Sequence, residues 1–263
     1  MARDPDPVLD AVLEAEYDNR ARVPDHPAVF ERWRATAEAA RAAHPPAEVA
    51  YGPGPRQRID LFEAAPDAPV VMFLHGGYWQ ALDKGWFSGL APAFLAHGVS
   101  LAVPSYDLAP RVDLATIVEQ ARRASEATRP RVVFGHSAGG HLAACLAAEG
   151  LAGAAVAISG LFELEPLIPT RINAALRLDP ATARALSPRL WTPPPGVVLD
   201  CVVGGEESGE FLRQSREMAE AWGLAGAVTR YEAPASLNHF TVLDPLFDVA
   251  SPLVARIVAL ARR

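Results

Sequence analysis

The sequence predicts an α/β protein with a mostly parallel central sheet and helices on both faces. Short apolar runs bounded by glycine or proline recur along the 263 residues, as expected of strands buried on both faces, and segments with helical periodicity lie between them. Strands and helices that alternate in this way form parallel sheets, because each helix returns the chain to the starting edge. Residues 1–263 are therefore expected to form a single domain.

The candidate strands follow one another in two groups. Glu48–Tyr51 and Gln57–Phe62 flank a Gly/Pro-rich turn, which predicts a β-hairpin. After the hairpin the alternation of polar and apolar residues gives way to continuous apolar runs, which predict interior strands. These runs are Val70–Leu74, Ser100–Val103, Arg131–Phe134, Ala154–Ile158 and Val197–Val203, and Ala227–Tyr231 is expected to be the last strand.

Three helices have clear end signals. Asp113 is a good N-cap for a helix that should stop before Pro130. The segment Phe211–Trp222 carries large apolar residues on one helical face, and Gly223 is expected to close that helix. Ser251-Pro252 predicts the start of the last helix.

Two further segments depart from the strand–helix alternation. Residues 1–45 have helical character with mixed polarity and are expected to be helices that cover the domain. Residues 160–196 form a long excursion with several prolines and weak helical stretches at Asn173–Leu178 and Pro180–Leu186. Such an insertion is typical of a small helical lid or cap over a substrate site.

Composition excludes several classes of function. The formal net charge of -7 argues against nucleic-acid binding, which needs a basic surface. No apolar run approaches the roughly 20 residues of a membrane-spanning helix, and the charged, proline-containing start lacks the apolar stretch of a signal peptide. Two cysteines cannot form a disulfide framework. We expect a cytoplasmic protein with no membrane or nucleic-acid partner; the oligomeric state stays open, with a homodimer as one candidate.

The strongest motif is Gly135-His136-Ser137-Ala138-Gly139. It follows a predicted strand and precedes a predicted helix, which is the context of a nucleophile elbow in serine hydrolases. Glycines at both ends permit the sharp turn that exposes the serine hydroxyl. Ser137 is therefore the predicted nucleophile, and a simple helix N-cap serine is the alternative.

A second motif, His75-Gly76-Gly77-Tyr78-Trp79, directly follows the strand Val70–Leu74. Backbone N–H groups of glycines in such a loop, with the N–H that follows the nucleophile, stabilise the oxyanion of a tetrahedral intermediate. We therefore predict an oxyanion hole made by Gly76, Gly77 and Ala138. His75 is expected to be a structural histidine.

The general base should lie late in the chain, in the order Ser…Asp/Glu…His. His239 is the only histidine C-terminal to His141, and it follows the last predicted strand. The acid should follow the strand Val197–Val203, where the turn contains Glu206 and Glu207. The spacing alone does not separate these two glutamates.

With these motifs placed, the chain resembles the kynurenine formamidases (arylformamidases) of the serine α/β-hydrolase type, from about Tyr51 to the C-terminus. The matching segments are His75-Gly-Gly-Tyr-Trp-Gln80, Gly135-His-Ser-Ala-Gly-Gly-His-Leu142, Ser159-Gly-Leu-Phe-Glu-Leu-Glu-Pro166, Glu210-Phe-Leu-Arg-Gln-Ser215 and Asn238-His-Phe240.

The resemblance implies an α/β-hydrolase fold and hydrolysis of N-formyl-L-kynurenine to L-kynurenine and formate, without a metal or cofactor. It assigns the acid to Glu207, where the family usually has aspartate. Tyr78 and Trp79 become candidates to contact the small acyl group of the substrate. Tyr106, Phe162 and Phe240 become candidates to pack on its aromatic ring, although each of these three could instead be a core residue.

Two other functions are compatible with these motifs. A carboxylesterase for short-acyl or aryl esters would use the same serine, histidine and carboxylate. A receptor or scaffold of this fold that has lost catalysis would typically lack one of them, and none is missing here.

Overall fold

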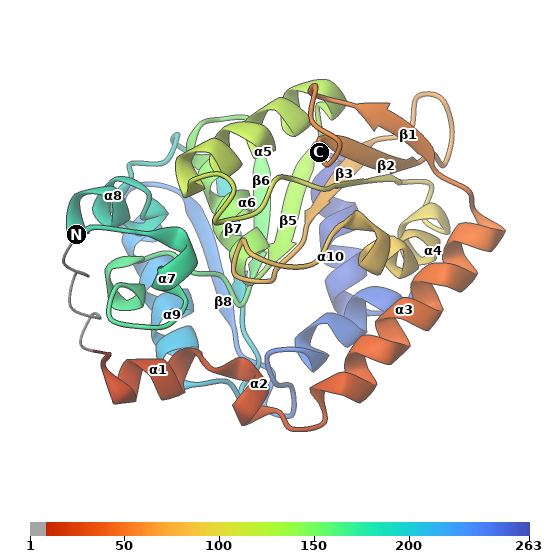
Figure 1. Cartoon of the computed structure of the whole chain (residues 1–263). Coiled ribbons are helices and arrows are strands. Elements are labelled where there is room, and N and C mark those ends of the chain that lie inside the picture. Colours follow the sequence, from red (N-terminus) through yellow and green to blue (C-terminus); the bar gives the residue numbers. More distant parts are fainter. Residues whose placement is uncertain (1–8) are drawn as a thin grey trace.

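The computed structural model describes residues 9–263, and residues 1–8 of the predicted N-terminal helical segment lie outside this range. The described chain is built around an eight-stranded sheet with the order β1-β2-β4-β3-β5-β6-β7-β8 (Figure 1). The strands are β1 (Ala47–Ala50), β2 (Arg58–Phe62), β3 (Val70–Leu74), β4 (Ser100–Pro104), β5 (Val132–His136), β6 (Ala154–Ile158), β7 (Val198–Val202) and β8 (Val228–Glu232).

The sheet has the predicted mixture of directions. β1 and β2 form the antiparallel hairpin expected from the Gly/Pro-rich turn, and β2 also pairs antiparallel with β4. From β4 to β8 all neighbouring strands are parallel. The carboxyl ends of these parallel strands therefore share one edge, where the loops that carry the motifs meet.

Helices cover both faces of the sheet. Along β3, Met72 and Leu74 belong to one buried apolar cluster and Val71 and Phe73 to the other, because successive side chains point to opposite faces. The first cluster includes α1 (Ala11–Tyr17), α5 (Leu114–Thr128), α6 (Ala138–Ala148) and α9 (Gly209–Leu224). The second includes α3 (His26–Ala43), η1 (Lys84–Leu90), α4 (Ala91–Leu95), η4 (Thr241–Phe247) and α10 (Pro252–Ala261).

The predicted helix ends are confirmed with one correction. Asp113 accepts a hydrogen bond from the backbone N–H of Thr116 at the start of α5, and Ser251 caps α10 in the same way. Gly223 does not close α9, because the helix continues to Leu224. The glycine with a positive φ, +95°, is Gly226, three residues further on.

The N-terminal helices and the 160–196 insertion pack against each other. The chain forms α1, α2 (Asn19–Arg22) and α3, while the insertion contains η2 (Glu165–Leu167), α7 (Asn173–Leu176), α8 (Pro180–Ala185) and η3 (Pro188–Leu190). The backbone N–H of Asp10 donates to the carbonyl of Pro169, and that of Arg171 donates to Glu14. No helix among residues 9–263 is long and apolar enough to cross a bilayer.

Candidate active site

Ser137 lies at a sharp turn between β5 and α6. Its backbone has φ 55° and ψ -120°, a conformation that a residue with a Cβ rarely adopts. A Cβ on Gly135 would lie 2.2 Å from the carbonyl oxygen of Gly139, and one on Gly139 would lie 1.9 Å from that of Leu74. Both glycines are thus required for α6 to pack closely against the strands, and the segment has the geometry of a nucleophile elbow.

The Gly76-Gly77 loop packs directly against this turn. A Cβ on Gly76 would lie 2.9 Å from the carbonyl oxygen of His136 and 3.1 Å from the Cβ of Ser137. Gly77 has φ +103°, which favours glycine, and Ala138 is the first residue of α6. Gly76 and Ala138 therefore lie next to Ser137, and Gly77 lines the same cavity as Ser137.

His239 lies in the loop after β8 and contacts Glu207, which follows β7. The Nδ1 atom of His239 lies 2.6 Å from Oε2 of Glu207, and both side chains are buried. Since a carboxylate only accepts, Nδ1 carries the proton and Nε2 is left free to act as a base. Glu206, the alternative acid, is exposed and makes no hydrogen bond or ion pair with His239.

The second oxygen of Glu207 has its own donors. The hydroxyl of Ser159 and the backbone N–H of Gly204 (2.7 Å) both donate to Oε1. Ser159 is completely buried and has a positive φ of 49°. These donors fix the orientation of the carboxylate toward His239. Ser159 belongs to a segment that matches the formamidase family, but its sequence context alone predicts no role for it.

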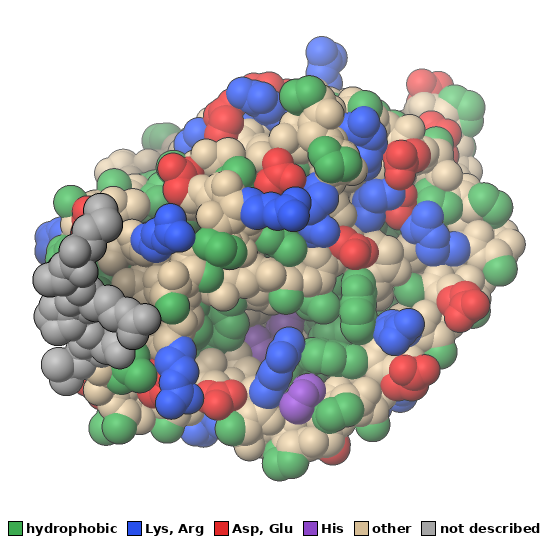
Figure 2. Space-filling model, viewed as in Figure 1, with side chains coloured by type: hydrophobic (Ala, Val, Ile, Leu, Met, Phe, Trp, Pro, Cys, Tyr) green, Lys and Arg blue, Asp and Glu red, His purple; other side chains and the backbone are tan. Residues whose placement is uncertain are grey.

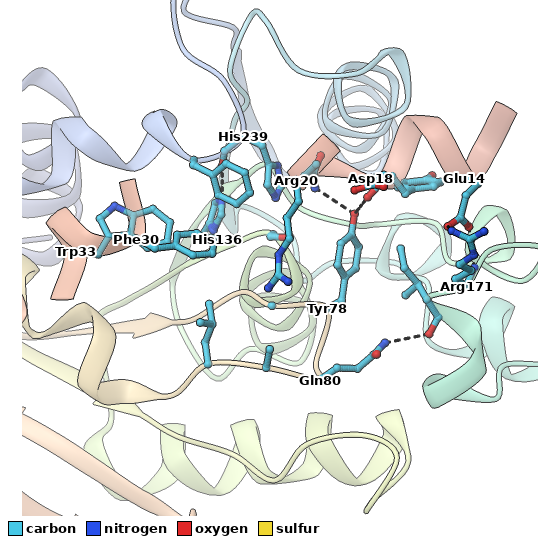
Figure 3. Close-up of a pocket in the computed structure, with 18 residues that line it drawn as sticks. Glu14, Asp18, Arg20, Phe30, Trp33, Tyr78, Gln80, His136, Arg171 and His239 are labelled. Carbon is cyan, nitrogen blue, oxygen red and sulfur yellow. Dashed lines mark hydrogen bonds and ion pairs between the residues drawn. The ribbon is translucent and has the colours of Figure 1, made fainter. Parts of the chain in front are cut away.

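Ser137 and His239 line the same cavity, which has a volume of about 510 Å³. Figure 2 shows the hollow in the molecular surface, with histidine side chains inside it. The cavity size is within the range of small-molecule sites. Its wall is built from the Gly76-Gly77 loop, the elbow, the His239 loop, two insertion residues and the N-terminal helices (Figure 3).

The contribution of the N-terminal helices was missed by sequence reasoning, which treated them as a cover. Tyr78 connects these helices to the Gly76-Gly77 loop by two hydrogen bonds. Its hydroxyl donates to the carbonyl of Tyr17 (2.7 Å) and accepts from the side chain of Asn19 (3.1 Å). Burial raises the pKa of the Tyr78 phenol, so it stays protonated. The mixed polarity of this segment was the available signal. The lining residues from it are Glu14, Tyr17, Asp18, Asn19, Arg20, Phe30 and Trp33.

The five aromatic candidates divide into two groups. Tyr78 and Phe240 line the cavity. Trp79, Tyr106 and Phe162 are almost completely buried and do not line the cavity. The prediction that they contact the substrate is therefore wrong, and they are core residues. The Tyr106 hydroxyl, for example, donates to the carbonyl of His75 at 2.7 Å.

Three other histidines near the elbow are buried. His75 stacks on Tyr106 with ring centroids 4.3 Å apart, which agrees with the predicted structural role. His141 hydrogen-bonds through Nε2 to the carbonyl of Leu186 in the insertion (2.8 Å). Burial lowers the pKa of both His75 and His141 to about 4. His136 lines the cavity beside His239.

Metal binding is not supported by the described part of the chain. Among residues 9–263, no group of three or more His, Cys, Asp or Glu side chains is positioned to bind one. The described site brings together the Ser137 hydroxyl, the His239 imidazole and, behind it, the Glu207 carboxylate.

The strand order, the elbow and this cavity define a hydrolase of the α/β type. Residues 71–262 match the model of the alpha/beta hydrolase family, and the chain belongs to that family. It is 28% identical to a kynurenine formamidase of Danio rerio over 76% of either protein, and 27% identical to one of Drosophila melanogaster over 74% of either. These relatives confirm the resemblance to arylformamidases that the motifs indicated.

Solved structures agree on the fold. A Silicibacter protein classed provisionally as a thioesterase is 35% identical, with a TM-score of 0.82 over 93% of this chain and 98% of its own. The carboxylesterase EstE1, from a metagenomic library, is 20% identical with a TM-score of 0.68 over 89% of this chain and 94% of its own. The second likeness supports the fold alone.

Proposed function

We propose that this hydrolase cleaves the formamide bond of N-formyl-L-kynurenine, with L-kynurenine and formate as products. The observation that carries the proposal is that His239, which lines the cavity of Ser137, is held by Glu207 through its Nδ1 atom. The chain that carries this contact is also similar to kynurenine formamidases; the similarity to the Danio rerio protein covers 76% of this chain.

In the proposed reaction Nε2 of His239 takes the hydroxyl proton of Ser137 as the oxygen attacks the formyl carbon. Glu207 accepts the Nδ1–H of His239 and stabilises the imidazolium that forms. His239 then gives the proton to the aniline nitrogen, which leaves as kynurenine. Water hydrolyses the formyl-enzyme by the same proton transfers and releases formate.

The oxyanion of each tetrahedral intermediate is assigned to the N–H groups of Gly76, Gly77 and Ala138. The close packing of the glycine loop on the elbow supports this assignment. Preorganised donors of this kind act strongly where water is excluded, and loss of one donor typically costs about 100- to 1000-fold in kcat.

The cavity wall fits an aromatic substrate. Phe30, Trp33 and Phe240 form one aromatic group on it, with Phe30 and Phe240 ring centroids 5.2 Å apart. Tyr78 lines it beside the oxyanion loop. An aryl formamide can pack its ring on this group while its formyl carbon reaches Ser137.

The test is the hydrolysis of N-formyl-L-kynurenine by the purified chain, followed by the absorbance of kynurenine. Turnover that is lost in Ser137→Ala, together with labelling of the wild type by a fluorophosphonate probe, supports the proposal. Absence of turnover, or full turnover by Ser137→Ala, overturns it.

A second candidate is ester or thioester hydrolysis, favoured by the 35% identity to the Silicibacter protein. It requires the same serine, histidine and carboxylate. Comparison of kcat/KM for N-formyl-L-kynurenine, a p-nitrophenyl ester and a short acyl thioester separates the two. A preference of several orders of magnitude for an ester or thioester replaces the first proposal with the second.

A further inference from the structure

Arg20 is a cation on the wall of the cavity that holds Ser137 and His239. It lies in α2, a short helix capped by Asp18, whose side chain accepts from the backbone N–H of Ala21. Figure 3 shows the Arg20 side chain extending across the site between the two histidines and Tyr78. Its guanidinium is thus available to a molecule bound in the cavity.

The other arginine on this wall is already paired. The guanidinium of Arg171 lies 3.7 Å from the carboxylate of Glu14 (Nη1 to Oε1), and the backbone N–H of Arg171 donates to the same carboxylate. Arg20 has neither an ion pair nor a side-chain hydrogen bond within residues 9–263; its guanidinium carbon lies 5.9 Å from the ring centroid of Phe30. The aromatic ring supports the cation by a cation–π contact and leaves its N–H groups free.

We propose that Arg20 binds the carboxylate of the amino-acid side chain of the substrate and so makes the cavity selective for aryl formamides that carry this group. The inference rests on the proposed function, because N-formyl-L-kynurenine is such a molecule. A guanidinium is always charged, and its planar fork matches a carboxylate with two parallel hydrogen bonds.

The remaining charges of the cavity favour a zwitterion over a simple anion. Glu14 and Asp18 line the same wall as Arg20. Glu14 is already paired with Arg171, so the ammonium group of the amino acid faces Asp18, whose Oδ1 alone accepts a hydrogen bond in the described residues. The carboxylate of the amino acid faces Arg20, the one unpaired guanidinium of the described wall. A neutral aryl substrate uses none of these groups and gains nothing from them.

The experiment compares N-formyl-L-kynurenine with 2-formamidoacetophenone, which keeps the aryl ketone and the formamide and lacks the amino-acid group. The measured quantity is the ratio of kcat/KM for the two substrates. Arg20→Gln should lower this ratio roughly 10- to 100-fold, through a higher KM for N-formyl-L-kynurenine. The loss of a hydrogen bond to a charged group changes an equilibrium constant by about that factor. Arg20→Lys keeps the positive charge but not the planar guanidinium, so its ratio should lie between those of the wild type and Arg20→Gln.

Arg22→Gln is the matched control. Arg22 lies in the same helix, faces Glu16 at 3.9 Å and does not line the cavity of Ser137. This variant should keep the wild-type ratio. An unchanged ratio in Arg20→Gln, or an equal fall in Arg22→Gln, overturns the inference.

The two proposals fail in different ways. Wild-type enzyme that cleaves neither formamide contradicts the proposed function. The role of Arg20 is then tested on phenyl acetate and (3-acetoxyphenyl)acetate, an ester pair that differs by an anionic carboxymethyl group. If Arg20→Gln leaves the preference within this pair unchanged, the inference also fails; a loss of preference for the anionic ester supports it.

Discussion

The Nε2 atom of His136 lies 2.7 Å from the backbone carbonyl oxygen of His239. His136 immediately precedes Ser137 at the end of β5, so the residue next to the proposed nucleophile holds the backbone of the proposed base. Burial, and then the neighbouring His239, lower the pKa of His136 well below its usual range. The neutral ring therefore donates its Nε2–H to this carbonyl, because a carbonyl can only accept.

Loss of this hydrogen bond should misplace His239 without removing it. We expect His136→Leu to lower kcat about 10-fold or more, since small misplacements of a catalytic group are costly. His136→Gln can present an amide N–H near the position of Nε2 and should recover much of the loss. The assay is hydrolysis of N-formyl-L-kynurenine with KM and kcat separated. Equal activity of His136→Leu and wild type would show that the contact does not position the base.

The carboxylate of Glu207 should matter through both its charge and its reach. Glu207→Gln removes the charge that stabilises the imidazolium and is expected to lower kcat by about 10³- to 10⁴-fold. Glu207→Asp keeps the charge, but its side chain is one methylene too short for the 2.6 Å contact with His239, so we expect an intermediate loss.

Glu206→Gln is the control for this pair of variants. Glu206 is exposed and makes no hydrogen bond or ion pair with His239, so its replacement should leave kcat near the wild-type value. A larger loss in Glu206→Gln than in Glu207→Gln would reverse the assignment of the acid.

The catalytic candidates could be predicted from sequence because topology brings them together. The segments after β3, β5, β7 and β8 all leave the carboxyl edge of one parallel sheet, so motifs far apart in the chain meet there. Local spacing could not separate Glu206 from Glu207. The family resemblance assigns Glu207, and the physical reason is three-dimensional, because the turn after β7 brings the Glu207 carboxylate to His239.

The cavity wall was harder to predict, for a physical reason. A hydrophobic pattern shows that one face of a helix or loop is buried, but not what buries it. Trp79 follows the oxyanion loop and is completely buried, while the adjacent Tyr78 lines the cavity. Tyr17 and Arg20 line the cavity because the N-terminal helices pack over this edge of the sheet, and the mixed polarity of these helices does not specify where they dock.

Stability should fall as the pH drops below about 6.5. His75 and His141 have folded-state pKa values of about 4 because of burial, against about 6.5 in an unfolded chain. Between these values the unfolded chain binds protons that the folded chain does not, so acid favours unfolding. Each histidine should reduce the free energy of unfolding by about 2 kcal/mol between pH 8 and pH 5, measured by urea denaturation.

His141→Gln isolates one of these contributions. The amide can still donate to the carbonyl of Leu186 but does not titrate, so the difference in unfolding free energy between pH 8 and pH 5 should shrink by about 2 kcal/mol. His44→Gln, at an exposed histidine, is the control and should keep the wild-type difference. If both variants behave alike, the buried imidazole of His141 is not a source of the acid sensitivity.

The close packing of α6 on the sheet should make Gly139 irreplaceable. A Cβ there would lie 1.9 Å from the carbonyl oxygen of Leu74 and 2.7 Å from that of His75, and backbone atoms cannot move aside as a flexible side chain can. We expect Gly139→Ala to lower the free energy of unfolding by about 3 kcal/mol or more. Gly153→Ala is the matched control, because a Cβ there meets no atom within 4 Å, and it should stay within about 1 kcal/mol of wild type. Urea denaturation of both variants decides: similar midpoints would mean that α6 can shift away from β3, and that the elbow does not depend on the close contact.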